Sequence, residues 1–211
     1  MAVYTAIDDA GSFFNPKLWV GSTSSNVITG VGFQPDLLWI KDRDSTAYHV
    51  LTDAVRGTDS QIYSNSSSAE GTLSTVVTSF DSGGFTISGS YPNDGNDYVT
   101  WCWKAGTTTG IAGSPSITPS SYSFNATSGF SIIKYVGTGA NATLPHGLGV
   151  APGMIIFKNL PIAENWIVYH EGIGPTKYLH LDLADAAGTQ TAMFNDTAPT
   201  ADLFTVGTSA S

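Results

Sequence analysis

The chain has 211 residues, 41% of them hydrophobic, which is enough apolar material to bury the core of one or two domains. Only 12% of the residues are charged, the formal net charge is −9 and 8 residues are Lys or Arg, a balance that argues against nucleic acid as a partner and against electrostatic attachment to an anionic membrane. The single cysteine, Cys102, excludes an internal disulfide framework.

Short runs of β-branched and aromatic residues, bounded by turn residues, predict an all-β chain. The 23 glycines and 10 prolines supply the turn signals, at a spacing of roughly eight to twelve residues that is typical of a sandwich or barrel. Asn93–Asn96 is predicted to be a hairpin loop, because Asp-Gly and Asn tolerate positive φ. Single helical turns are predicted at Asp53–Arg56 and Ala184–Ala187. In chain order, the predicted strands are Lys17–Val20, Leu37–Lys41, Leu73–Phe80, Phe85–Ser88, Tyr98–Lys104, Phe130–Val136, Met154–Lys158, Trp166–His170, Tyr178–Leu183 and Phe204–Val206.

The two halves of the chain resemble each other. Gly32–Lys41 aligns with Gly149–Lys158 at an offset of 117 residues, the difference between Pro152 and Pro35. The order is kept throughout, with small changes of offset where loops are expected, and this predicts a tandem duplication. The further aligned segments are Trp19–Gly21 with Tyr135–Gly137, Tyr48–Val50 with Trp166–Val168, and Phe85–Ser88 with Phe204–Gly207.

The duplication predicts two tandem homologous β-sandwich (jelly-roll-like) units, residues 14–106 and 129–211, after an N-terminal arm of residues 1–13. Residues 107–128 are rich in Ser, Thr, Gly and Pro, which favours a linker or an extended crossover. The first unit continues into the aromatic strand Tyr98–Lys104, whereas the second lacks this final strand. We therefore expect that the polypeptide continues beyond Ser211, or that another segment completes the unit.

Motifs in both halves carry a resemblance to a known family. They are Gly32–Lys41, Leu51–Gly57, Ser79–Phe85 and Tyr98–Gly106, followed by Pro145–Pro152, Glu164–His170 and Phe194–Thr200. In this combination the chain resembles a tandem-repeat family of phage structural and tail-fibre-like proteins from aquatic, marine cyanophage-type phages. The resemblance covers nearly the whole chain, including Tyr4–Asp9, and it brings no catalytic residues with it.

The resemblance implies a structural component of a bacteriophage virion, most specifically the N-terminal part of a tail fibre. Residues 1–13 would then dock on the particle or contact other subunits. The alternatives are a capsid decoration or fibre protein, and a carbohydrate-binding module that recognises the host surface. By analogy with phage fibres, the expected partners are further copies of the chain, as a homotrimer, together with other tail or capsid proteins and, in the second alternative, host surface glycans.

The expected location follows from two features of the sequence. The start of the chain has neither the basic region nor the apolar region of a signal peptide. No apolar run approaches the ~20 residues that span a bilayer. We therefore expect synthesis in the host cytoplasm, a place in the virion and no membrane insertion.

No catalytic, metal or cofactor site is predicted, and we expect a protein that is not an enzyme. The histidines, His49, His146, His170 and His180, lack the fixed spacing of a ligand set. Cys102 lies between two tryptophans on a predicted strand, where a buried and unreactive thiol is expected. The acidic residues cluster in turn sequences, which explains them without the paired carboxylates of a glycosidase. Asp94–Asp97 lacks the ordered ligands of an EF-hand calcium loop.

The tryptophans allow two interpretations. Trp39, Trp101, Trp103 and Trp166 could form a sugar-stacking platform, as in lectins. However, Trp39 aligns with Ile156, and Trp166 aligns with Tyr48. Positions that are large and apolar in both copies, without always carrying the same ring, favour a place in the core.

Overall fold

The structure, a computed structural model, describes residues 7–72, 76–89 and 91–209 and confirms the all-β fold. Two short helical elements accompany the strands in this part of the chain, the 3-10 turn η1 (Ala10–Ser12) and the α-helix α1 (Thr191–Phe194). The chain divides into two compact units. Unit 1 comprises the described part of Met1–Ser64 together with Glu70–Gly106, and unit 2 comprises Asn65–Ala69 together with the described part of Thr107–Ser211.

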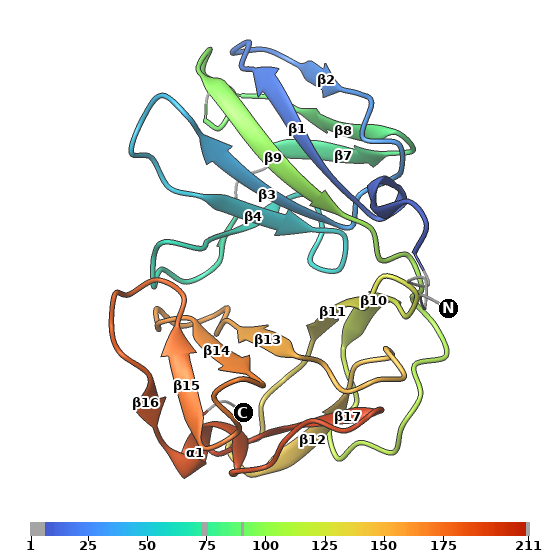
Figure 1. Ribbon diagram of the computed structural model, residues 1–211. Helices are drawn as coiled ribbons and strands as arrows, with labels where there is room; N and C mark the ends of the chain where they lie inside the picture. The colour runs from blue at the N-terminus through green and yellow to red at the C-terminus, as the bar shows by residue number, and fades with distance from the viewer. Residues whose placement is uncertain (1–6, 73–75, 90, 210–211) are drawn as a thin grey trace. The chain divides into compact units, whose positions relative to one another are not determined.

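Unit 1 is a β-sandwich of two antiparallel sheets (Figure 1). The larger sheet has six strands in the order β1-β9-β3-β4-β5-β6, and the smaller has the order β2-β8-β7. The strand β9, although it comes last in the unit, lies between β1 and β3. The strands are β1 (Phe14–Val20), β2 (Asn26–Ile28), β3 (Leu37–Asp42), β4 (Val50–Asp53), β5 (Ser60–Tyr63), β6 (Gly71–Thr72), β7 (Val77–Asp81), β8 (Gly84–Ile87) and β9 (Asp97–Trp103).

The core of unit 1 lies between its two sheets. Because successive side chains of a strand point to opposite faces, every second residue of β9 and β3 turns inward. Tyr98, Cys102 and Leu38 are wholly buried on this inner face. They belong to the same buried cluster as Phe85 and Ile87 of β8, so the two sheets share one core.

Unit 2 contains three smaller antiparallel sheets. They have the orders β10-β11, β12-β17 and β13-β14-β15-β16. Leu144 and Phe204, which face each other across β12 and β17, lie in a second buried cluster. The strands are β10 (Ser121–Asn125), β11 (Phe130–Lys134), β12 (Ala142–Pro145), β13 (Met154–Phe157), β14 (Ile167–His170), β15 (Lys177–His180), β16 (Gly188–Thr189) and β17 (Leu203–Val206).

The two units have a common strand order over most of their length. The sheet β13-β14-β15-β16 follows the chain as β3-β4-β5-β6 does, and β12 pairs with β17 as β2 pairs with β8. The pairing register also agrees, because Ile28 lies opposite Phe85 and Leu144 lies opposite Phe204. The units differ at β9, which is the second partner of β3. In the described part of unit 2, β13 pairs with β14 alone.

Each predicted strand is observed, but β2, β4, β5, β6, β10, β12 and β16 were not predicted, and three other predictions need correction. Each predicted strand has a counterpart, although residues 73–75 of the run Leu73–Phe80 lie outside the described residues. The predicted hairpin at Asn93–Asn96 is wrong, because the strands on either side of it, β8 and β9, belong to different sheets. The expected linker contains the strand β10, whose tyrosine and phenylalanine alternate with small polar residues. A single helical turn is present at Asp53–Arg56, where the Gly57 amide donates to the Asp53 carbonyl at 3.0 Å, but none is present at Ala184–Ala187, and the α-helix lies at Thr191–Phe194.

Candidate interaction surface

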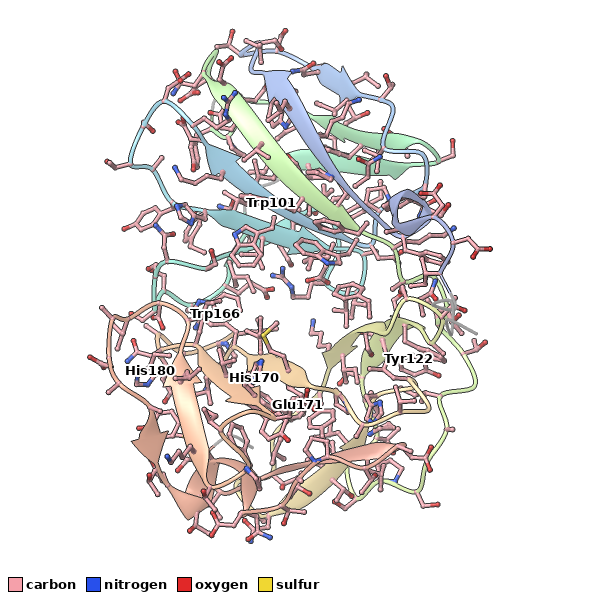
Figure 2. All side chains as sticks on the ribbon, in the orientation of Figure 1. Trp101, Tyr122, Trp166, His170, Glu171 and His180 are labelled. Atoms are coloured by element: carbon pink, nitrogen blue, oxygen red, sulfur yellow. The ribbon has the colours of Figure 1, made fainter. Side chains whose placement is uncertain are left out.

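The six-stranded sheet of unit 1 carries apolar side chains on the face that points away from the core. Residues directly opposite in neighbouring strands point to the same side of a sheet, so the outward residues of β1, β9 and β3 form rows across the three strands. Figure 2 labels Trp101, from the middle strand β9. We call this surface the outer aromatic face and define it by Phe14, Trp103 and Leu37 in one row, Pro16, Trp101 and Trp39 in the next, and Leu18 and Val99 in the third.

Four rings of the outer aromatic face lie close together. The ring centroids of Phe14 and Trp103 are 4.9 Å apart, and those of Trp39 and Trp101 are 6.1 Å apart in an edge-to-face arrangement. Trp39 also lies 6.3 Å from Trp103, with the rings closer to parallel. Ring pairs at these separations attract each other beyond the burial of their surface, so the rings hold one another in place.

The outer aromatic face is accessible to solvent on unit 1. Leu18 is 63% exposed and Phe14 is 36% exposed, although both are large apolar side chains. Trp39, Trp101 and Trp103 are half-buried, because the neighbouring rings cover part of each. Contiguous apolar side chains left in contact with water are characteristic of a surface that binds something.

Charged groups lie at one end of the outer aromatic face. The Lys41 ammonium donates hydrogen bonds to the carbonyl oxygens of Asp42 and Ser45, the second at 3.0 Å. The Arg43 guanidinium lies 3.7 Å from the Asp97 carboxylate. These contacts direct both cations to neighbours on unit 1. Lys41, which lies opposite Val99, is the charged residue at the end of the third row.

The core interpretation of the tryptophans is wrong for three of them. Trp39, Trp101 and Trp103 lie outside the buried cluster of unit 1, on the outer face of its sheet. A signal in the sequence could have shown this. Cys102 is the inward residue of β9, so its two neighbours in the strand must point outward. Trp166 is buried as expected, and its indole N–H donates to the carbonyl of Ser66, 3.1 Å away within unit 2.

The rings of His146, His170 and His180 each have a local partner. His146 is buried, its Nε2 lies 3.1 Å from the carbonyl oxygen of Thr200, and its Nδ1 accepts a hydrogen bond from the Leu148 amide. Burial lowers the pKa of His146, against the opposing effects of the Thr200 carbonyl and the Asp202 carboxylate. Among the described residues, no three His, Cys, Asp or Glu side chains are grouped so that they could hold a metal ion.

His170 and His180 come from the adjacent strands β14 and β15, and both are labelled in Figure 2. His170 accepts a hydrogen bond from the Gly172 amide at 3.0 Å. Nδ1 of His180 lies 3.5 Å from the Asp185 carboxylate. Each ring is thus held by a neighbour close in sequence.

The buried ionisable groups of unit 1 have structural partners. Burial raises the pKa of the Cys102 thiol to about 12, which keeps it protonated and unreactive at neutral pH. Burial also acts to raise the pKa of Asp42, but hydrogen bonds from Ser45, Asn96 and the Asp44 amide outweigh it and hold this pKa below its usual value. The Asp42 carboxylate therefore closes a turn.

The chemistry available to the outer aromatic face is that of an apolar, ring-bearing surface. It can bury its side chains against another protein, or it can stack its rings on the apolar faces of sugars. No helix in the described part of the chain has the length and apolarity to cross a membrane.

Comparison with known proteins yields one match. The family described as a domain of unknown function (DUF7483) matches residues 9–211, nearly the full chain. No curated protein and no solved structure matches the chain.

Proposed function

We propose that this chain, which belongs to the DUF7483 family, is a non-enzymatic structural component of a bacteriophage virion and the N-terminal part of a tail fibre. In this proposal the protein is made in the host cytoplasm and works in the particle, where its partners are further copies of the chain, as a homotrimer, and other virion proteins. The family description names no function, so the support comes from the sequence motifs quoted above and from the surface of unit 1.

The observation that carries the proposal is the outer aromatic face. Interfaces between subunits are enriched in aromatic residues and depleted of charge at their centres, and the rows of this face have that composition. Leu18 and Phe14 lie on β1, at one end of the strand order, so a neighbouring subunit could cover both the face and the edge of the sheet. Contact between copies through this face is the assembly role that we assign to it.

The common strand order supports a second part of the proposal, that the two units are copies of one ancestral unit. Two independent features agree, namely the sequence alignment at offsets near 117 and the matching pairing of β2 with β8 and of β12 with β17. Repetition of one β unit along a chain is an economical way to build an elongated particle component.

A carbohydrate-binding role on the host surface is the second candidate function. The same three tryptophans favour it, because half-exposed indole rings offer flat apolar surfaces for sugars. The two candidates differ in what Trp101 contacts: a ring of another subunit in the first, and a glycan in the second.

Sedimentation of the full chain over a range of concentrations tests the proposal. We expect self-association that Leu18→Glu weakens, because the substitution places a charge in the third row of the face. Val27→Glu is the matched control: Val27 lies on β2 in the other sheet and is 61% exposed, close to the 63% of Leu18.

Two outcomes would count against a structural fibre role. The first is a chain that stays monomeric at every concentration. The second is binding to a glycan array that Trp101→Ala abolishes, which would support the carbohydrate-binding role instead. Electron cryomicroscopy of intact particles then distinguishes a position on the tail from one on the capsid, which would indicate a decoration protein.

A further inference from the structure

The strand β13 of unit 2 has one open edge. In unit 1 the corresponding strand β3 pairs with β4 on one edge and with β9 on the other. In the described part of unit 2, β13 pairs with β14 on one edge, and no strand pairs with the other. The two side chains of β13 that point outward, Met154 and Ile156, are 56% and 37% exposed.

Backbone hydrogen bonds establish which groups of β13 face the open edge. The Glu171 amide donates to the Gly153 carbonyl, 2.8 Å away, which makes these two residues a hydrogen-bonded pair of the β13–β14 ladder. Such pairs alternate with pairs whose N–H and C=O groups point away from the partner strand. Met154 and Ile156 are in the second class, so their backbone groups are directed to the open edge.

The strand β3 shows what an edge of this kind binds. Just beyond β3, the Arg43 amide donates to the Asp97 carbonyl of β9 at 2.8 Å. Trp39 lies four residues before Arg43 and opposite Trp101 of β9. Since backbone groups alternate in direction along a strand, those of Trp39 are directed to β9 as well. Trp39 aligns with Ile156 in the sequence comparison. The open edge of β13 is therefore the counterpart of the edge at which β3 binds β9.

The strand β11 presents a second edge of the same kind. Thr107 and Phe124 exchange two backbone hydrogen bonds of 3.0 Å on the edge of β10 that faces away from β11. Because the backbone groups of Phe124 point to Thr107, Phe124 does not bond to Ser131, the residue opposite it in β11. The backbone groups of Ser131 thus face away from β10. The strand β1 aligns with β11 at an offset of 116, so odd-numbered residues of β11, such as Ser131, align with odd-numbered residues of β1. The odd-numbered residues of β1 bond to β9, because the Lys104 amide donates to the Phe13 carbonyl.

The core of unit 2 is also less completely covered where β9 would lie. In unit 1, β9 contributes Tyr98 and Cys102, which are wholly buried, and Ile40 beside them is wholly buried too. Phe157, the counterpart of Ile40 in β13, packs on the core of unit 2 but stays half-buried. The Ser131 hydroxyl oxygen on β11 is buried and has no hydrogen-bond partner among the described residues.

We propose that the open edge of β13 is a docking site for an antiparallel β-strand that has the pattern of β9 and lies outside these 211 residues. The strand that fits is uncharged between its ends, as β9 is from Tyr98 to Trp103. It directs a ring and then smaller side chains toward the core, as Tyr98, Thr100 and Cys102 do. A second copy of this chain cannot lend its own β9, because that strand is paired along its full length with β1 and along most of it with β3. Docking adds main-chain hydrogen bonds for affinity and side-chain pockets for specificity. This inference does not depend on the phage assignment.

Binding of a synthetic peptide to the full 211-residue chain tests this site. The probe has the sequence of Asn96–Ala105 with Cys102→Ser to prevent oxidation. We expect one peptide to bind per chain and to slow amide hydrogen exchange at Met154 and Ile156 by about tenfold or more, because both amides gain a partner strand. If the peptide does not bind, or if it slows amide hydrogen exchange in unit 1 alone, the proposal is overturned.

Two controls separate edge pairing from other binding. A peptide N-methylated at alternate residues keeps its side chains but cannot donate to β13, and we expect it to lose binding without any change to the protein. Ile156→Pro removes an amide that faces the open edge while sparing the ladder to β14, and we expect it to weaken binding. Equal binding of the methylated peptide would contradict edge pairing. Self-association of the free chain that protects the same two amides would show that a second copy occupies the site, which would also overturn the proposal.

Discussion

Arg56 of unit 1 makes the most enclosed ion pairs in the described part of the chain. Its guanidinium lies 2.5 Å from the Asp53 carboxylate and 2.9 Å from the Glu70 carboxylate, and the side chains of Arg56 and Asp53 are each 5% exposed. A further N–H donates to the Leu51 carbonyl. Two carboxylates and a carbonyl thus satisfy a cation that water cannot reach, and a change at this residue affects all of them.

Arg56→Met is therefore expected to lower the free energy of unfolding by about 3–5 kcal/mol, because it leaves Asp53 as a buried charge without its partner. Urea denaturation measures the change. Arg43→Ala is the control, since the Arg43–Asp97 pair has side chains about half exposed, and such pairs contribute about 0–1 kcal/mol. Similar losses for the two variants would show that the enclosure of Arg56 is energetically unimportant.

We expect His146 to make the stability of unit 2 depend on pH. Its Nδ1 accepts a hydrogen bond from Leu148, so the ring is neutral with its proton on Nε2, which faces the Thr200 carbonyl. Burial lowers the folded-state pKa of His146 below the ordinary 6.5. The unfolded chain then binds the proton more readily, so the stability is fully present above about pH 6.5 and declines as the pH falls.

Urea denaturation at pH 8 and at pH 5 tests this dependence. We expect a lower midpoint at pH 5 and a smaller difference between the two values in His146→Gln. Burial and Lys41 also lower the pKa of His49, in unit 1, so we expect His49→Gln to remove a separate part of the pH dependence. A pH dependence that persists in full in His146→Gln would exclude His146 as its source.

At the level of elements, the strands could be predicted from the sequence where β-branched and aromatic residues are continuous. β9 and β13 are examples of such runs. β10 was missed because its rings alternate with serine and asparagine, and β6 and β16 because they have two residues each. The path of the chain after β8 could not be predicted, because the turn signal at Asn93–Asn96 does not specify which sheet the next strand joins.

Proline substitutions at two aligned positions test whether β3 is paired on both edges and β13 on one. Trp39→Pro removes an amide on the edge that pairs with β9, so we expect a marked destabilisation through the lost ladder hydrogen bond. Ile156→Pro removes the corresponding amide at the open edge of β13, so we expect a smaller loss. Urea denaturation of both variants, with Trp39→Ala and Ile156→Ala to correct for the lost side chains, gives the comparison. Equal losses after that correction would mean that the edge of β13 is already paired in solution.

At the level of the whole molecule, the described residues form two buried clusters with no member in common. Leu38 and Leu144 are wholly buried, one in each cluster. Either residue changed to Ala is expected to cost about 2–5 kcal/mol through lost burial and the cavity left behind.

Because the cores are separate, each substitution should destabilise its own unit. Hydrogen exchange under native conditions checks this: Leu144→Ala should lower the protection of β12 and β17, and Leu38→Ala that of β3 and β9. Equal loss of protection in both units from either change would show that they unfold as one.

The sequence alignment of the two halves places β3 opposite β13, and these strands hold equivalent places in their sheets. The alignment did not predict the outer aromatic face, since only the position of Cys102 in its strand signals it. Whether a tryptophan turns to the core or to solvent depends on the parity of its strand, and the run Tyr98–Lys104 is aromatic on both faces. The sequence therefore identified Trp39, Trp101 and Trp103 as candidates, but the core interpretation assigned them to the wrong face of the sheet.

The difference between β3 and β13 also has an evolutionary consequence. A new binding surface ordinarily requires many substitutions that make it apolar and complementary to a partner. In a chain whose two units share a strand order, an edge left open in one unit is enough, because that edge already has the hydrogen-bonding pattern that β9 matches in the other unit. Unit 1 supplies the sequence pattern of a matching strand, so selection would have to shape the partner strand alone and not the acceptor.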